Sequence, residues 1–550
     1  MSCISHDASV IAIDILKPHI VLLNAMIVNL LIAGTRVLSR KLFKSTAIVS
    51  SMTMISRILG FIRDMLFARL FGADSGTDAF FVAFKIPNFL RRLFAEGAFA
   101  QAFVPVLSDY KEQGGKAALR YFIDRTAGTL ALILMLTTII GMLAAPYLIM
   151  AFAPGFSWEG EQYELAVQML RITFPYLFFI SSVAFAGGIL NTFGKFAIPA
   201  FTPVFLNICL ISAAIWLAPL MSQPVVALAI GVFVAGAVQL IFQFPALRWL
   251  GLVPRLRFGF RDPGVKRIMK LMLPALFGVS VTQINLLLDT LLASFLTTGS
   301  ISWLYYSDRL VEFPLGVFGI ALATVILPNL SRNHAAENTE AFSRSLDWGL
   351  KLVVLIGVPA SLGLLMLAEP MVSTLFQYHH FGVNDVTMTG RSLMAYALGL
   401  LGFILVKVLV PGFTSRKDMK TPVRFGIYAV VANMILNLVL VFPLAHAGLA
   451  LATSLAAFFN ASLLLFALLK TKIYRPSRGW RLLLLRITLA ASAMVSLIYH
   501  CVDNSLWHGW GLVDRAWHLA MWIAIAATLY AVVLLLSGLR LRHLSASTGK

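Results

Sequence analysis

Seven ionisable side chains interrupt two apolar stretches near the amino terminus of this 550-residue chain. They are Arg57, Arg63, Asp64, Lys85, Arg91, Arg92 and Glu96. An ionised group at the centre of a bilayer costs about 2.5–3.5 kcal/mol, so such groups almost always face a protein interior or a water-filled cavity. Five cations against two anions leave the cluster with a net charge of +3, which predicts that its ligand is an anion.

Helical spacing predicts which of these charges meet, because residues three, four or seven apart lie on one face of a helix. Arg57 and Asp64 share a face with Arg63 beside them, and Arg92 and Glu96 are four residues apart. In one interpretation these pairs only neutralise each other. In the other, the arginines clamp a pyrophosphate, because a guanidinium binds phosphate through two parallel hydrogen bonds. Neutralisation does not account for the remaining cations of the cluster.

A second charged patch lies in the stretch 303–330. Asp308 and Glu312 are four residues apart, and Arg309 and Glu312 are three apart. Pro314 and Gly316 follow the patch, so the helix is expected to flex just beyond the charges.

Other charges in or beside apolar stretches are isolated. Asp78 is either the N-cap of its own helix or an outer gate partner for a cation. Asp289 lies close to the end of its stretch, which favours a side chain that reaches toward the membrane surface. His379 and His380 have no carboxylate or cysteine at metal-binding spacing and are interpreted as part of a solvated loop.

The overall composition is that of a membrane protein. Hydrophobic residues make up 59% of the chain and charged residues 12%, against about 25% charged in soluble domains. The net charge of +20 does not indicate a nucleic-acid partner, because basic residues of membrane proteins gather in cytoplasmic loops. Three cysteines without C-x-x-C spacing predict neither a disulfide framework nor a zinc site. No metal site or cofactor is expected, and no Ser-His-Asp set or phosphate loop can be assigned.

Fourteen stretches are long and apolar enough to cross a bilayer as helices. They are 46–70, 79–107, 127–153, 164–189, 198–219, 225–247, 268–296, 303–330, 348–375, 387–411, 422–444, 448–469, 482–501 and 516–538. Unpaired backbone in lipid excludes open sheets. The predicted fold class is therefore an all-α integral membrane protein with 14 transmembrane helices.

The loops between these stretches orient them, because lysine and arginine are retained on the cytoplasmic side. Six alternate loops hold 23 Lys and Arg residues, and the seven loops on the opposite side hold none. Both termini are therefore predicted to be cytoplasmic.

An internal repeat divides the chain. The segment 98–108 returns as 321–331 with five identities in eleven positions, at an offset of 223. Two parallel six-helix lobes are predicted, 41–247 and 248–470, related by an axis along the membrane normal. Residues 471–550 add two helices, and 1–40 form an amino-terminal extension.

Three runs of residues resemble one known family: 51–64, 76–99 and 303–314. They are similar to the MurJ (MviN) family of lipid II flippases, in the MOP exporter superfamily. The resemblance extends from about residue 41 to the end, so the extension 1–40 lies outside it. It implies a transporter rather than an enzyme, with the last two helices shaping a groove for a polyprenyl tail.

The resemblance also assigns roles to residues. The family's substrate-binding arginines match Arg57, Arg63, Arg91 and Arg309. Its important acidic positions match Asp78, Asp308 and Glu312, which with Asp64 are the candidates for gating or coupling. Arg92 and Glu96 are then expected to form a supporting ion pair.

The implied substrate is lipid II, the undecaprenyl-pyrophosphate-linked peptidoglycan precursor, moved from the inner to the outer leaflet of the bacterial cytoplasmic membrane. Membrane lipids are implied as partners, and so is the machinery of peptidoglycan synthesis and division. Coupling to the membrane potential or to a monovalent ion is expected. The alternative is an exporter of the same fold for another polyprenyl-linked oligosaccharide.

Overall fold

The computed structural model describes residues 40–540, and the predicted extension 1–40 lies outside them except for Arg40. Within that range some side chains are not described, namely those of residues 40–47 and 94–96 and several between 275 and 286 and between 320 and 324. All regular secondary structure in the described residues is helical. The coarse prediction of an all-α membrane protein is therefore confirmed.

The first part of the chain folds into α-helices with short π and 3-10 segments. These are α2 Arg40–Phe71, α3 Ser75–Leu90, π segment η1 Arg91–Phe99, α4 Ala100–Gln113, α5 Gly115–Leu143, α6 Ala145–Phe152, α7 Glu161–Thr173, α8 Tyr176–Thr192, α9 Ala197–Ser212, π segment η2 Ala213–Leu217, 3-10 segment η3 Ala218–Leu220 and α10 Val226–Trp249.

The rest of the chain continues in the same way. Its elements are α11 Pro263–Ser294, α12 Ser300–Pro314, π segment η4 Leu315–Gly319, α13 Ile320–Ala335, α14 Thr339–Met366, α15 Ala368–Phe376, α16 Val383–Thr414, α17 Lys420–Lys470, α18 Trp480–Cys501, α19 Asn504–Trp507 and α20 Leu512–Leu536.

Nine helices in the described residues are long and apolar enough to cross a membrane. One of them, α17, is 51 residues long and is kinked at Ala445, so it contains the two predicted spans 422–444 and 448–469. The predicted spans that carry the charge clusters are not among the nine. They fall on α2, on α3 with η1 and α4, and on α12 with η4 and α13.

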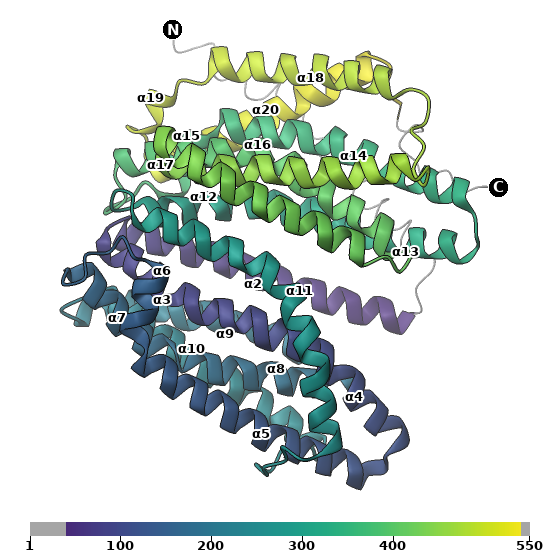
Figure 1. Cartoon of the computed structure of the whole chain (residues 1–550). Helices are drawn as coiled ribbons and strands as arrows, with labels where there is room; N and C mark the ends of the chain where they lie inside the picture. Colours follow the sequence, from purple (N-terminus) through teal and green to yellow (C-terminus); the bar gives the residue numbers. More distant parts are fainter. Residues whose placement is uncertain (1–39, 541–550) are drawn as a thin grey trace.

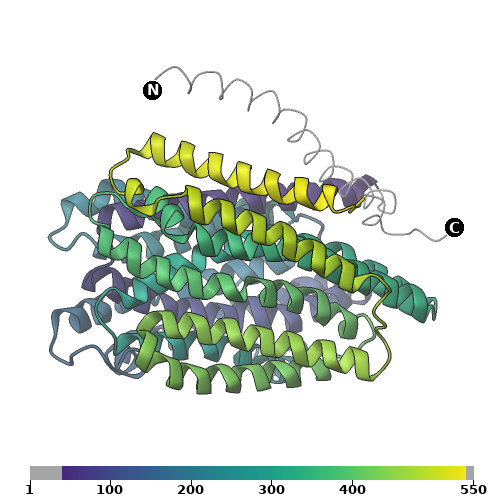
Figure 2. The same ribbon diagram turned by 90° about the horizontal axis from the view of Figure 1, so that it is seen from above.

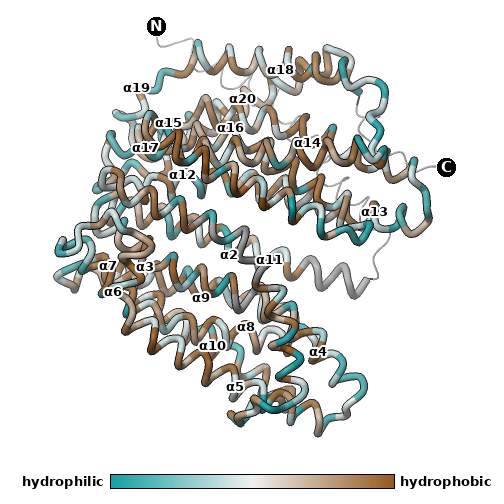
Figure 3. The backbone as a smooth tube through the Cα atoms, in the orientation of Figure 1, coloured by the Kyte–Doolittle hydropathy of each residue, from teal (hydrophilic) through white to brown (hydrophobic). Residues whose placement is uncertain are grey.

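The helices lie side by side in two groups (Figure 1). Helices α2–α10 form one group and α12–α17 the other, and α11 contacts both, since it packs on α4 and η1 as well as on α17. Figure 3 shows hydrophobic residues along the helices and hydrophilic ones gathered in many of the connecting loops, as expected for a bundle surrounded by lipid.

Helices α18 and α20 lie at one edge of the bundle in both views (Figures 1 and 2). At one end, Asp347 of α14 accepts hydrogen bonds from Tyr474 at 2.8 Å and from Trp480 at 2.7 Å. At the other end, the buried guanidinium of Arg515 donates to the backbone carbonyls of Ser373 at 3.1 Å and Gln377 at 2.9 Å. The pair is thus fastened at both ends to α14 and the α15 end of the second group.

Two π segments interrupt long helices at corresponding places. Shifted by the repeat offset of 223, η4 falls on residues 92–96, which lie within η1. Extra residues in a helical turn loosen the regular backbone ladder and are frequent at functional sites. The π segment η4 begins directly after Pro314, at the place where the helix is expected to flex.

Candidate functional site

Arg63 of α2 binds three side chains at once. Its guanidinium donates to Asp64 Oδ1 at 2.7 and 2.9 Å, to Asn207 Oδ1 at 2.9 Å and to the Tyr305 hydroxyl at 3.1 Å. Tyr305 in turn donates to Asp64 at 3.0 Å. The side chain of Asp64 is 2% exposed and that of Arg63 is 11% exposed, so little water competes for these bonds. The cluster joins α2 to α12, across the two groups of helices.

Packing of neutral residues holds this cluster in place. The Tyr305 ring stacks on Phe81 of α3, with ring centroids 3.9 Å apart. Asn207 of α9 donates its amide hydrogen to the Ser56 carbonyl at 2.9 Å, and its side chain lies beside Gly60. The orientation of Arg63 is therefore fixed by three different helices.

Arg309 extends the cluster toward solvent. Its guanidinium carbon lies 4.9 Å from the centroid of the Tyr305 ring, and its Nη1 donates to Glu312 Oε2 at 2.6 Å. Its Nε is 3.9 Å from Asp64 Oδ2, which is an ion pair but too long for a hydrogen bond. The side chains of Arg309 and Glu312 are 29% and 47% exposed. Asp308 is half-buried and lies within electrostatic reach of both.

Arg57 does not pair with Asp64, so that part of the neutralisation interpretation is wrong. Asp64 is bound instead by the adjacent Arg63. Arg57 is exposed, and its guanidinium occupies the place where a Cβ on Gly316 would stand. A cation of the first group thus rests directly on the π segment η4 of the second.

Asp78 of α3 also joins the two groups of helices, because it caps the start of α12 in the opposite group. Its carboxylate accepts hydrogen bonds from the backbone N–H of Gly299 at 2.7 Å and of Ser302 at 2.8 Å, and from the Ser302 hydroxyl at 2.6 Å. The N-cap of its own helix is Asp74, which accepts from the Thr77 N–H at 2.8 Å. The N-cap prediction for Asp78 was therefore wrong about which helix it caps, and its partner is a helix N-terminus rather than a cationic side chain.

Lys85 of α3 meets a polar group of the second part of the chain. Its amine donates to the hydroxyl of Thr290, and it lies within electrostatic reach of Asp289 and Asp308. Asp289 accepts from the amide of Asn437 in α17 at 2.8 Å and is buried. The expectation that Asp289 reaches toward the membrane surface is therefore wrong, because a neutral amide and a nearby ammonium compensate its burial.

The remaining predicted arginines lie around η1. Arg91 donates to the Asn88 side chain of its own helix at 2.7 and 2.9 Å. The side chain of Glu96 lies outside those that the structure describes, so its pairing with Arg92 stays a prediction. The four predicted substrate arginines do not form one ring here: Arg63 and Arg309 share Tyr305 and Asp64, whereas Arg57 and Arg91 have other partners.

The loop that carries His379 and His380 is exposed, as expected, but it also contacts the first group of helices. Arg69 Nη2 lies 3.2 Å from His379 Nε2. The backbone carbonyl of His380 stands so close to Gly72 that a Cβ there would overlap it. The Tyr306 hydroxyl donates to the Gly72 carbonyl at 3.3 Å. These contacts and the Asp78 cap join both groups at the end of the bundle where α2 finishes.

Sequence reasoning missed the neutral partners of the charges. They are Tyr305, Asn207, Ser302 and Asn437. A tyrosine or an asparagine in an apolar stretch is not unusual by itself, so only the long-range contacts reveal these residues. Among the described side chains, no three His, Cys, Asp or Glu residues are placed to hold a metal ion.

Comparison with known proteins gives consistent matches. A family model described as "Lipid II flippase MurJ" matches residues 67–521. A probable lipid II flippase MurJ of Vibrio cholerae is 49% identical over 518 residues, covering 93% of this chain and 99% of that protein. A solved structure titled "Lipid II flippase MurJ, inward closed conformation" superposes with a TM-score of 0.75 at 29% identity, covering 88% of this chain and 97% of that one. An inward-facing MATE transporter of the MOP superfamily has the same fold, with a TM-score of 0.64 at 15% identity over 78% of this chain and 98% of its own.

Proposed function

Because the chain belongs to the MurJ family of lipid II flippases, we propose that it moves lipid II from the inner to the outer leaflet of the cytoplasmic membrane by alternating access. The observation that carries this proposal is the cluster of Arg63, Asp64, Tyr305 and Arg309, which joins the two groups of helices deep in the bundle. A pyrophosphate is an anion that such a cationic cluster would bind, and the family match favours lipid II over another polyprenyl-linked oligosaccharide.

In this proposal the chain has 14 spans, with two six-helix lobes at 41–247 and 248–470. The π segments η1 and η4 support the repeat, because they correspond at the same offset of 223 as the repeated sequence. The basic loops support cytoplasmic termini. The end joined by the Asp78 cap and by Gly72 with His380 is then the outer end, and it is closed.

In this proposal the charged residues bind the substrate and also hold the two lobes together. Arg57 and Glu312 are exposed and Arg309 is partly exposed although all three lie in mid-helix, which supports a water-filled space open to the cytoplasm. We infer that the pyrophosphate binds between Arg57 and Arg309 and competes with Asp64 for Arg309. Because the Arg309–Asp64 ion pair is one of the ties between the two lobes, substrate binding would loosen it and permit the lobes to rock.

Arg63 and Arg91 would complete the binding site after small rearrangements. Arg63 would exchange its bond to the Tyr305 hydroxyl for a phosphate oxygen, which is a stronger acceptor because it is charged. Arg91 would do the same with its bond to the neutral Asn88 amide. Asp64, Asp308 and Glu312 would then carry the gating or coupling role.

The driving force in this proposal is the membrane potential, worth about 2.3 kcal/mol per charge per 100 mV. With a negative interior, an empty cationic site is drawn toward the cytoplasmic side. The bound anion cancels this bias and permits outward opening. The polyprenyl tail would stay in lipid beside α18 and α20, and membrane lipids and the peptidoglycan synthesis and division machinery would be further partners.

The test is the appearance of lipid II at the outer leaflet after native protein has been depleted from cells that carry a variant. Arg57→Ala and Arg309→Ala are expected to abolish it while the protein remains folded in the membrane. Arg416→Ala is the matched control, because Arg416 is an exposed arginine in the loop between α16 and α17. Normal lipid II exposure with both cluster variants would refute the proposed site.

A further inference from the structure

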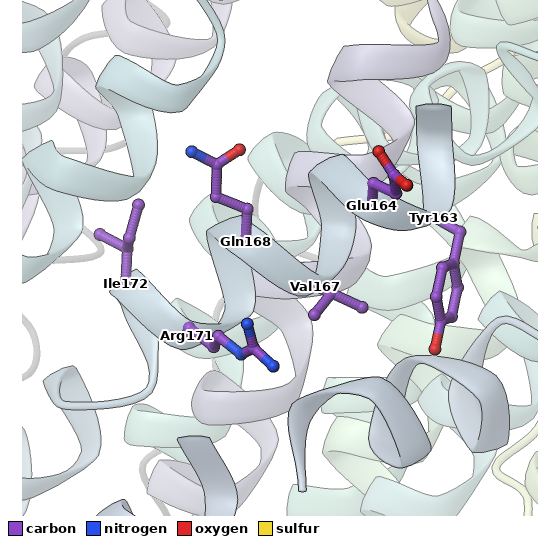
Figure 4. A pocket seen from close by; sticks show the side chains of 6 residues that line it. All are labelled: Tyr163, Glu164, Val167, Gln168, Arg171 and Ile172. Carbon is purple, nitrogen blue, oxygen red and sulfur yellow. The ribbon is translucent and has the colours of Figure 1, made fainter. Parts of the chain in front are cut away.

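A pocket of about 480 Å³ lies on the surface of α7 (Figure 4). Its lining residues are Tyr163, Glu164, Val167, Gln168, Arg171 and Ile172. Glu164, Gln168 and Arg171 are spaced by four and three residues, so they share one exposed face of the helix. Among the interactions of the described residues, these three side chains have no hydrogen-bond or ion-pair partner. A polar, unpartnered face on a membrane helix needs a ligand or water.

The depth of this face follows from helix length. Helices α7 and α8 together form a candidate span of 32 residues, Glu161–Thr192, which is about 48 Å long. No charge follows Arg171 before the end of α8, and the uncharged stretch Ile172–Thr192 would measure about 32 Å, close to the thickness of the bilayer hydrocarbon. Arg171 therefore lies at the boundary between hydrocarbon and headgroups. Glu164, seven residues earlier, lies about 10 Å further toward water.

The order of the charges selects the ligand. A guanidinium at the boundary lies where lipid phosphates are, and it can bind a phosphate through two hydrogen bonds. A carboxylate further out lies where a headgroup amine would be, and an ammonium group donates three hydrogen bonds. We propose that this pocket binds the headgroup of a phosphatidylethanolamine-type lipid, with phosphate on Arg171 and amine on Glu164. The identity of the leaflet that supplies this lipid rests on the orientation given in the proposed function. The binding of the lipid does not depend on that orientation.

The surroundings suit a bound lipid. The Tyr163 hydroxyl donates to the Pro146 carbonyl at 3.1 Å, and its ring stacks on Trp158 with centroids 5.9 Å apart, so one wall of the pocket is fixed. Trp158 is itself exposed, as aromatic residues at membrane interfaces commonly are. Helices α5 and α6 contact α7 and expose Leu143 and Tyr147, which offer apolar surface to the acyl chains.

Choline gives a sharp comparison, because its quaternary ammonium has no N–H to donate to Glu164. The purified full-length protein would be incubated in mixed micelles with equal amounts of phosphatidylethanolamine and phosphatidylcholine, and retained lipids would be counted by native mass spectrometry. The native protein should retain the ethanolamine lipid about fivefold better, the ratio expected for one charge-assisted hydrogen bond near a surface. Equal retention of the two lipids would overturn the proposal.

Two variants separate the two contacts. Glu164→Gln should remove the preference for ethanolamine while phosphate-bearing lipids are still retained. Arg171→Gln should lower retention of both lipids about fivefold. Arg248→Gln is the matched control, because Arg248 is an exposed arginine in the last turn of α10, away from the pocket. Unchanged retention in Arg171→Gln with an unchanged unfolding temperature would overturn the assignment, and so would an equal loss in Arg248→Gln.

Discussion

Asp78 shows how one carboxylate can hold two parts of a membrane protein together. The first N–H groups of a helix have no partner within the helix and carry partial positive charge, so a carboxylate satisfies them well. Here the carboxylate comes from α3, and the N–H groups belong to Gly299 and Ser302 at the start of α12. The cap exists only while the two groups of helices touch, so it favours the closed form of this end of the bundle over an open one.

Removing this carboxylate should therefore open this end of the bundle, which is the outer end in the proposed orientation. Losing a helix cap costs about 1–2 kcal/mol, which would raise the open population by roughly five- to thirtyfold. In Asp78→Ala, a cysteine introduced at the fully buried Ser307 should react with a membrane-impermeant thiol reagent faster by that factor. Asp78→Asn, which keeps one acceptor oxygen, should lie between Ala and the native protein. Equal rates in all three proteins would refute a gating role for the cap.

Residue spacing predicted the charged cluster only in part. Ideal helix geometry pairs residues three, four or seven apart, and this favoured Arg57 with Asp64. In the structure Asp64 binds its neighbour Arg63, because Asn207 and Tyr305 hold that guanidinium over it from two other helices. Those contacts span 144 and 242 residues, so no local pattern could reveal them.

At the scale of elements, the contact between α2 and the π segment η4 depends on a glycine. The guanidinium of Arg57 fills the space beside Gly316 where any other residue would place its Cβ. This close approach explains why the sequence after Pro314 contains a glycine at that point. The sequence predicted flexibility here, but it could not predict that a side chain of another helix would use the space.

Gly316→Ala should therefore displace Arg57 and slow lipid II flipping severalfold. Gly363→Ala in α14 is the matched control, because nothing lies within 4 Å of the position that its Cβ would take. Both substitutions replace a helical glycine by alanine and have similar intrinsic effects on the helix. The two variants would be compared by their flipping rates in vesicles of equal protein content. Equal rates would show that the contact between Arg57 and Gly316 does not contribute to flipping.

The helices themselves were largely predictable, because long apolar stretches have few alternatives in lipid. Their ends were less so. α14 begins at Thr339 and α16 ends at Thr414, beyond the apolar windows 348–375 and 387–411, since polar residues can continue a helix out of the membrane. The break between α7 and α8 at Phe174 and Pro175 falls inside a single predicted span.

At the scale of the whole molecule, the family assignment and the distribution of charge agree. Basic loops lie at one end of the predicted bundle, and the exposed Arg57 and the partly exposed Arg309 lie within it. A charge that moves through part of the membrane field makes the rate depend on voltage, by up to about 2.3 kcal/mol per charge per 100 mV.

Lys407 provides a test of this dependence that leaves the proposed binding residues intact. It is exposed in α16, and its side chain lies beside Gly319 of η4. In Lys407→Gln the flipping rate in vesicles should vary less steeply with an imposed potential than in the native protein. Lys420→Gln changes an exposed lysine at the start of α17 and should leave the steepness unchanged. Identical slopes in all three proteins would exclude a voltage-dependent movement of this part of the site.

The hydrogen bonds that attach α18 and α20 to the second group of helices determine how this pair can move. Asp347 and Arg515 tie this pair to α14 and α15 at its two ends, so in the proposed alternating-access cycle the pair would move together with the second group of helices. Its distance to Arg309 would stay nearly constant, while its distance to Arg57 would change through the cycle. A substrate whose headgroup is bound near Arg57 and whose tail lies beside α18 and α20 would have to span a distance that changes during the cycle. A long flexible hydrocarbon chain can adapt to such a change.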